Sequence, residues 1–81
     1  MNQAVIVKSN LIEVTLNSEF YPDDILEKAI EDYSKLFDIK IDKTKEKLKI
    51  ILKPKQEIQD LQIIGYEFVN YLLYLIKNRC L

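Results

Sequence analysis

The sequence predicts an α+β fold, a two-layer ββαββα sandwich in which two helices cover one face of a four-stranded sheet. Four short stretches, two before residue 17 and two between residues 39 and 52, have the β-branched or alternating apolar pattern of strands. Two longer stretches place apolar residues three and four positions apart, as in helices packed on a core. With 81 residues, 48% of them hydrophobic, we expect residues 1–81 to form a single domain with a small core.

The first two strands are predicted to form a hairpin. Residues 4–7 are rich in β-branched side chains, and Asn10 in the Ser9-Asn10 pair can adopt the positive φ of a tight turn. Residues 11–16 alternate, which assigns three side chains to the inner face of the sheet: Ile12, Val14 and Leu16.

The first helix is predicted to run from Pro22 to about Leu36. Proline suits the first helical position, and Asp23 and Asp24 in the first turn complement the helix dipole. The apolar positions follow a helical spacing through the segment: Ile25, Leu26, Ala29, Ile30, Tyr33, Leu36 and Phe37.

The second half of the chain is predicted to contain two strands and a long helix. Ile39 and Ile41 belong to the third strand, and Pro54 ends the fourth, whose inner residues are Leu48, Ile50 and Leu52. The last helix is expected from Ile58 to about Arg79. Its inner stripe is predicted to contain Leu61, Ile64, Phe68, Leu72 and Leu75, with Gly65 allowing close approach to the sheet.

The last helix carries more apolar residues than one buried stripe needs. We therefore expect an interface, in a homo-oligomer or with a different protein, that contains Tyr66, Val69, Asn70, Tyr71, Leu73 and Tyr74. The alternative is that the tyrosines pack over the edges of the same core. Asn70 is either an interfacial hydrogen-bonding group or a solvent-facing residue.

Charge is distributed unevenly along the chain. Residues 13–32 contain seven acidic residues and one lysine, whereas residues 40–55 contain seven lysines and two acidic residues. Within the second segment, Lys49, Ile51 and Lys53 point away from the predicted core and are candidate peptide or edge contacts. The alternative is that these lysines protect a strand edge from aggregation. We do not expect nucleic-acid binding, because the net charge is −1 and no aromatic residue lies among the lysines.

The residue inventory argues against catalysis and against a bound cofactor or metal. The chain has no histidine, one cysteine and one glycine, so it lacks the residues for a zinc site, an iron–sulfur cluster or a P-loop. We predict that it is not an enzyme. The N-terminal residues lack signal-peptide features, and the apolar run of the last helix is shorter than the ~20 residues that cross a membrane, so we expect a cytoplasmic protein.

A series of short motifs extends over about four-fifths of the chain: Phe20-Tyr21, Ala29 and Tyr33, Ile39 to Asp42, Leu52 to Lys55, Glu67-Phe68-Val69-Asn70, and Leu72-Leu73. In this series, from Glu13 to about Arg79, the chain resembles the HxsD family of the His-Xaa-Ser system, small proteins found alongside radical SAM peptide-modifying enzymes. Pro22 departs from the family pattern, which has serine or a similar cap, and the strand and turn within residues 1–10 are an addition to it.

The resemblance implies an accessory protein in the maturation of a ribosomally made peptide, with the chemistry carried out by the radical SAM enzyme. This chain would recognise the substrate peptide as an added strand or dock its last helix on the enzyme. The alternative is a small dimerisation subunit similar to the Pcc-type subunit of the KEOPS tRNA-modification complex, which the element order and Asn70 also resemble. A third, weaker alternative is an RNA-binding module that uses the lysine-rich segment.

Overall fold

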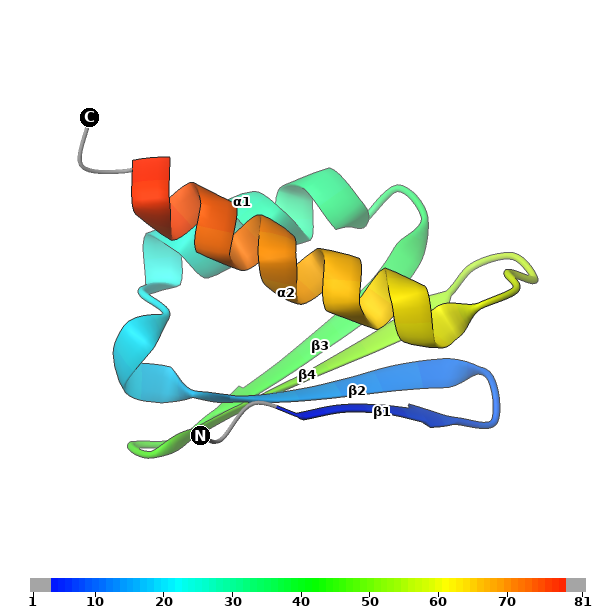
Figure 1. Cartoon of the computed structure of the whole chain (residues 1–81), viewed down its shortest axis with the longest axis horizontal. Coiled ribbons are helices and arrows are strands. Elements are labelled where there is room, and N and C mark those ends of the chain that lie inside the picture. The colour runs from blue at the N-terminus through cyan, green and yellow to red at the C-terminus, as the bar shows by residue number, and fades with distance from the viewer. Residues whose placement is uncertain (1–3, 79–81) are drawn as a thin grey trace.

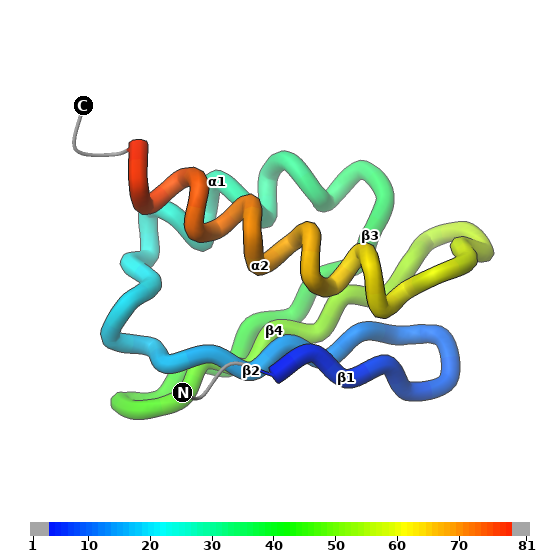
Figure 2. The backbone as a smooth tube through the Cα atoms, viewed as in Figure 1, coloured from blue at the N-terminus to red at the C-terminus, as the bar shows by residue number. Residues whose placement is uncertain are grey.

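The computed structural model describes residues 4–78 and has the predicted two-layer α+β architecture, with both helices on one side of a four-stranded antiparallel sheet (Figure 1). The elements in chain order are β1 (Ala4–Lys8), β2 (Leu11–Asn17), a short 3-10 helix (Ser18–Phe20), α1 (Asp23–Tyr33), β3 (Phe37–Lys43), β4 (Lys47–Pro54) and α2 (Leu61–Asn78). The two helices lie side by side and run in opposite directions over the sheet (Figure 2).

The strand order in the sheet is β1-β2-β4-β3, so β2 and β4 are central and β1 and β3 form the edges. The register pairs Val14 of β2 with Ile50 of β4, and Ile50 in turn with Ile41 of β3. This register brings the predicted inner residues of neighbouring strands onto the same face, where the helices cover them.

The core lies between the sheet and the two helices. The inner residues predicted for the two central strands are fully buried: Ile12, Val14, Leu16, Leu48, Ile50 and Leu52. Ile39 and Ile41, also predicted to face the helices, pack against this core but are half-buried, because β3 has a neighbour on one side only. Phe68 and Leu72 of α2 complete the core as predicted.

The end of α1 differs from the prediction. The helix stops at Tyr33, and Phe37 is the first residue of β3 rather than part of the helical stripe. Leu36, predicted to be on the same stripe, is 61% exposed. Its carbonyl accepts a hydrogen bond from the Lys55 N–H at 2.9 Å, which extends the β3–β4 pairing and removes Leu36 from the helix. Pro22 is the N-cap, one position before its predicted place.

Two other local predictions were wrong. In the β1–β2 hairpin the residue with positive φ is Ser9, at 50°, and not Asn10. The last helix begins at Leu61 rather than Ile58, because Asp60 has a φ of 57° and its carbonyl accepts hydrogen bonds from the N–H groups of Ile63 and Ile64. The predicted end of this helix near Arg79 lies outside the described residues.

Gly65 allows α2 to lie close to the sheet, as predicted. A Cβ atom at this position would lie 2.4 Å from Cγ1 of Val5 and 3.0 Å from Cγ2 of Ile12. The N-terminal half of α2 therefore rests directly on β1 and β2.

Candidate interaction surfaces

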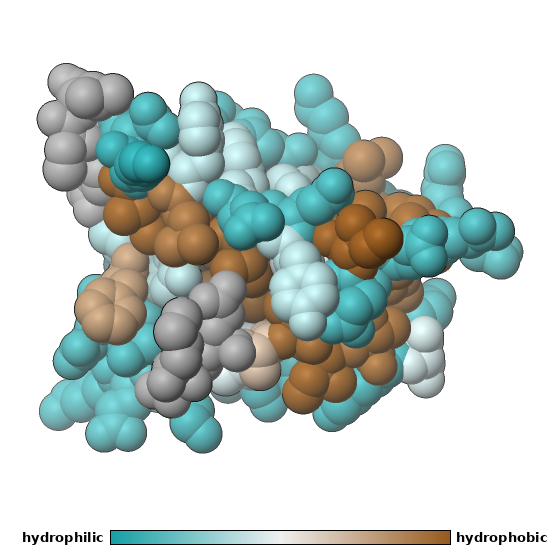
Figure 3. All heavy atoms as spheres, viewed as in Figure 1, coloured by the Kyte–Doolittle hydropathy of each residue, from teal (hydrophilic) through white to brown (hydrophobic). Residues whose placement is uncertain are grey.

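The face of α2 that points away from the sheet is a stripe of largely uncharged side chains. Its four large hydrophobic residues are between 45% and 60% exposed, and Asn70 lies exposed among them. We call this set the outer stripe: Ile63, Tyr66, Asn70, Leu73 and Tyr74. Apolar side chains reach the surface along the course of α2 between polar ones (Figure 3). Four of the six residues predicted for an interface belong to this stripe.

The other two predicted interface residues have roles inside the chain. Val69 is 1% exposed, so its assignment to a surface was wrong. It follows Gly65 by four positions and precedes Leu72 by three, which places all three on the buried side of the helix. That spacing was the sequence signal for its burial. Tyr71 is half-buried and turned towards α1, where its ring lies 5.9 Å from that of Tyr33.

The Tyr71 hydroxyl donates a hydrogen bond to the Asp32 carboxylate and so links α2 to α1. This bond is the main reason that the pKa of Asp32 is lowered. It also raises the pKa of Tyr71 to about 12, because the phenolate would lie against the carboxylate. Lys28 forms an ion pair with the same carboxylate at 3.5 Å. The side chains of Asp32 and Tyr71 thus form contacts within the chain that hold α1 and α2 together.

Lys49, Ile51 and Lys53 lie on the open face of the sheet, as expected from their alternation, but not at an edge. Their strand, β4, is paired on both sides, so the predicted edge contact was wrong. Alternation along a strand reports which face a residue occupies, and it carries no information on the neighbouring strands. A peptide added as a further strand would have to pair with β1 or β3.

The lysines of β4 face acidic residues on the neighbouring strands. Lys49 lies 3.8 Å from Glu13 of β2, which also pairs with Lys8 at 3.6 Å. On the other side, Asp42 is opposite Lys49 and Asp38 is opposite Lys53. The lysine-rich segment therefore does not form a uniformly basic face, because Glu13 and Asp38 from outside the segment and Asp42 within it lie next to its lysines.

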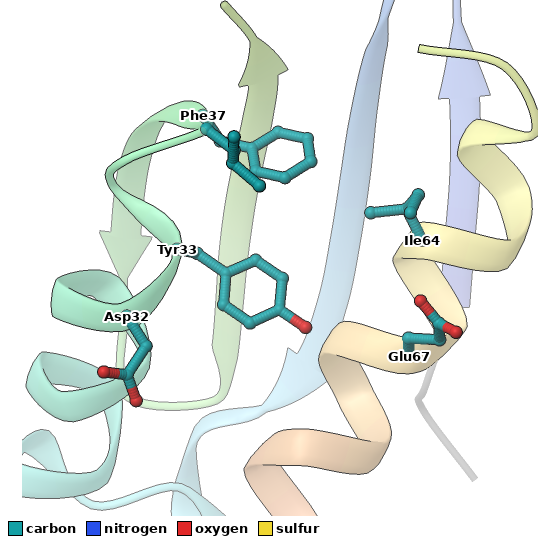
Figure 4. Close-up of a pocket in the computed structure, with 6 residues that line it drawn as sticks. Asp32, Tyr33, Phe37, Ile64 and Glu67 are labelled. Carbon is teal, nitrogen blue, oxygen red and sulfur yellow. The ribbon is translucent and has the colours of Figure 1, made fainter.

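A cleft between α1 and α2 is a feature that the sequence did not predict (Figure 4). Its volume is about 230 Å³, and six residues line it: Asp32, Tyr33, Leu36, Phe37, Ile64 and Glu67. We call it the interhelix cleft. The six residues come from α1, the turn after it, β3 and α2, so no local pattern could have revealed it, although Tyr33 and Glu67 both belong to the motif series.

No group of three or more histidine, cysteine, aspartate or glutamate side chains within residues 4–78 is arranged to hold a metal ion. None of the helices in this range combines the length and the apolar character that crossing a membrane requires.

Comparisons with protein-family models, with curated proteins and with solved structures find no match to this chain. The resemblance to the HxsD family, and the function that it implies, therefore stay predictions.

Proposed function

We propose that this chain is a non-catalytic accessory protein of the cytoplasm that docks on a radical SAM enzyme and brings a ribosomally made peptide to it. The observation that carries the proposal is the outer stripe of α2. Its hydrophobic residues are between 45% and 60% exposed although the core beneath the helix is already complete. Exposed apolar residues that line up along one helix face, rather than scattered singly, are typical of protein–protein interfaces.

The composition of the outer stripe supports a protein partner. Tyrosine and leucine are combined here with an amide and with no charged residue, and tyrosine is enriched at interfaces while charges are depleted at their centres. Asn70, exposed between Tyr66 and Tyr74, offers a side-chain amide for hydrogen bonds to the partner. A helix that lays such a face into an apolar groove is a common mode of recognition.

The nature of the partner comes from the sequence. The motif series resembles the HxsD family, whose members accompany radical SAM enzymes, and Glu67-Phe68-Val69-Asn70 belongs to that series. Phe68 and Val69 of this motif are buried, whereas Glu67 and Asn70 are exposed. The two exposed residues are available to partners, and they lie on neighbouring parts of the α2 surface.

The test is the affinity of the chain for the radical SAM protein encoded in its gene neighbourhood, measured by biolayer interferometry. We expect Leu73→Lys to weaken binding at least about tenfold, because it buries a charge at the interface centre. Ile6→Lys is the matched control: Ile6 is 44% exposed, against 45% for Leu73, but lies on β1. Its affinity should stay within about threefold of the wild type. The proposal would be contradicted if the two variants bound the enzyme with equal affinity. It would also be contradicted if the gene neighbourhood encoded no radical SAM protein and the chain bound none.

A further inference from the structure

The interhelix cleft has an apolar interior that opens to solvent where α1 ends and α2 begins. Phe37 is buried at its base, Tyr33 and Ile64 are half-buried on its two sides, and Leu36 at its margin is exposed. Tyr33 extends from α1 into the space between the helices, with its hydroxyl directed towards α2 (Figure 4).

The aromatic side of the cleft is held in place by packing. The Tyr33 ring meets the buried Phe68 ring edge-on, with centroids 4.9 Å apart and an interplanar angle of 81°. The Phe37 ring lies 6.0 Å away on another side. Because Tyr33 is fixed by these contacts, its ring presents a preformed surface to whatever enters the cleft.

The polar margin of the cleft is negatively charged. Asp32 lies on one side and Glu67 on the other (Figure 4). Lys28 forms an ion pair with Asp32, and the positive charge of Lys35 also helps to lower the pKa of the Asp32 carboxyl group. The Glu67 carboxylate forms no ion pair or side-chain hydrogen bond with any residue in the described range 4–78. Burial raises the pKa of Tyr33, and the charges of Glu67 and then Asp32 raise it further, as expected for a negative potential in the cleft.

We propose that the interhelix cleft binds one arginine side chain of a partner polypeptide. Its aliphatic stem would lie against Tyr33, Phe37 and Ile64, and its guanidinium group would pair with Glu67. An apolar lining with a carboxylate at the margin suits a side chain with an apolar stem and a cationic head. Arginine fits better than lysine, because a guanidinium group both stacks on aromatic rings and pairs with carboxylates through two hydrogen bonds.

The size and charge of the cleft select against other occupants. Its volume of about 230 Å³ lies below the ~300–1,000 Å³ typical of small-molecule sites, and it suits a single side chain. A neutral apolar side chain would leave Glu67 without a counter-ion, and an acidic one would be repelled by it. The proposal rests on the proposed function only for the source of the arginine, which would be the peptide undergoing maturation.

The probe for this proposal is an acetylated, amidated pentapeptide with arginine between two pairs of alanines, titrated into ¹⁵N-labelled protein by NMR. We expect saturable shifts centred on the residues that line the cleft. Peptides with norleucine or glutamate in place of arginine should bind at least about fivefold more weakly, the effect of losing one partly exposed charge pair. A lysine peptide should bind more weakly than the arginine peptide.

The matched pair of variants is Glu67→Gln and Glu27→Gln. Both residues are exposed glutamates on helices, but Glu27 does not line the cleft. We expect about a fivefold loss of affinity for the arginine peptide with the first variant and no change with the second. Equal binding of the arginine and norleucine peptides, equal effects of the two variants, or shifts that avoid the cleft would overturn the proposal.

Failure of this proposal can be distinguished from failure of the proposed function. Leu73→Lys changes the outer stripe and not the cleft, so it should bind the arginine peptide like the wild type. Arginine binding that persists when the enzyme does not bind would contradict only the docking function. Docking that depends on Leu73 but is accompanied by no arginine selectivity would contradict only the cleft proposal.

Discussion

Replacement of Gly65 by alanine tests how closely α2 lies on the sheet. The added Cβ would be 2.4 Å from Cγ1 of Val5, whereas carbon atoms in contact are about 3.5–4.0 Å apart. Val5 is β-branched and has little freedom about χ1, so its methyl group cannot simply rotate away. Ile12, 3.0 Å from the same Cβ, is fully buried in a central strand. The helix or β1 must move to accept the methyl group.

Two opposing terms set the size of the effect. Alanine is favoured over glycine in a helix interior by about 1 kcal/mol. Overpacking of a filled site costs about 1–3 kcal/mol. With the overlap spread over two side chains, we expect the steric cost to exceed the propensity gain and Gly65→Ala to lower the free energy of unfolding by about 1 kcal/mol.

The assay is urea unfolding followed by circular dichroism, in a double-mutant cycle with Val5→Ala. Removal of the Val5 methyl groups should make the Gly65→Ala change at least about 1 kcal/mol more favourable than it is in the wild type. Asn70→Ala, at an exposed position of the same helix, reports the propensity term alone and should be slightly stabilising. A stabilising Gly65→Ala with no coupling to Val5 would refute the close approach of α2 to the sheet.

Three further predictions concern the core, a part-buried hydrogen bond and a titration. Phe68→Ala should lower the free energy of unfolding by about 3–5 kcal/mol in denaturant titrations, because this ring is fully buried. Ser18→Ala should cost about 0.5–1.5 kcal/mol, since it removes the part-buried 2.7 Å bond that the Ser18 hydroxyl donates to the Lys45 carbonyl. The pKa of Tyr71, about 12 in the folded protein, should fall towards 10 in Asp32→Asn when followed by near-ultraviolet absorbance. The wild type should accordingly lose stability as the pH rises from about 10 to 12, and the variant should lose less.

Each of these predictions has a control. Tyr66→Ala removes an exposed ring from the same helix and should change the free energy of unfolding by less than about 0.5 kcal/mol. If Phe68→Ala changed it by as little as Tyr66→Ala, the orientation of the helix described here would be wrong. Ser34→Ala removes an exposed hydrogen bond, from the Ser34 hydroxyl to the Glu31 carbonyl. If both serine variants lost the same free energy of unfolding, the burial of Ser18 would make no difference to stability. Tyr71→Phe should delete the high-pKa titration, and its persistence in that variant would assign it to another tyrosine.

Much of the fold could be predicted because burial follows local alternation. In β2 and β4 the apolar residues recur at every second position, and each of the six predicted inner residues is buried. The α1–β3 boundary could not be placed this way. Tyr33, Leu36 and Phe37 have a spacing that fits a helix, but the Leu36 carbonyl pairs with Lys55, nineteen residues further along the chain, and this contact starts the strand.

The candidate surfaces were predictable only where one element forms them. The outer stripe lies on a single helix, so its exposed residues could be recognised from sequence. The spacing of Val69 from Gly65 and Leu72 likewise places Val69 on the buried side of this helix. The position of Lys49 at the centre of the sheet depends on strand order, which alternation does not encode. The interhelix cleft requires the relative placement of α1 and α2, which side-chain packing determines.

The most direct test of the central claim, that the outer stripe is covered in an assembly, is the mass of the protein in solution. Light scattering should be recorded for the wild type and for Leu73→Lys, each alone and mixed with the radical SAM protein. We expect the wild type to enter a complex well above the 9.6 kDa of one chain, and Leu73→Lys to remain a folded monomer in both samples. A mass above 9.6 kDa for the wild type alone would assign the stripe to a second copy. A wild-type protein that is monomeric both alone and with the enzyme would contradict the account.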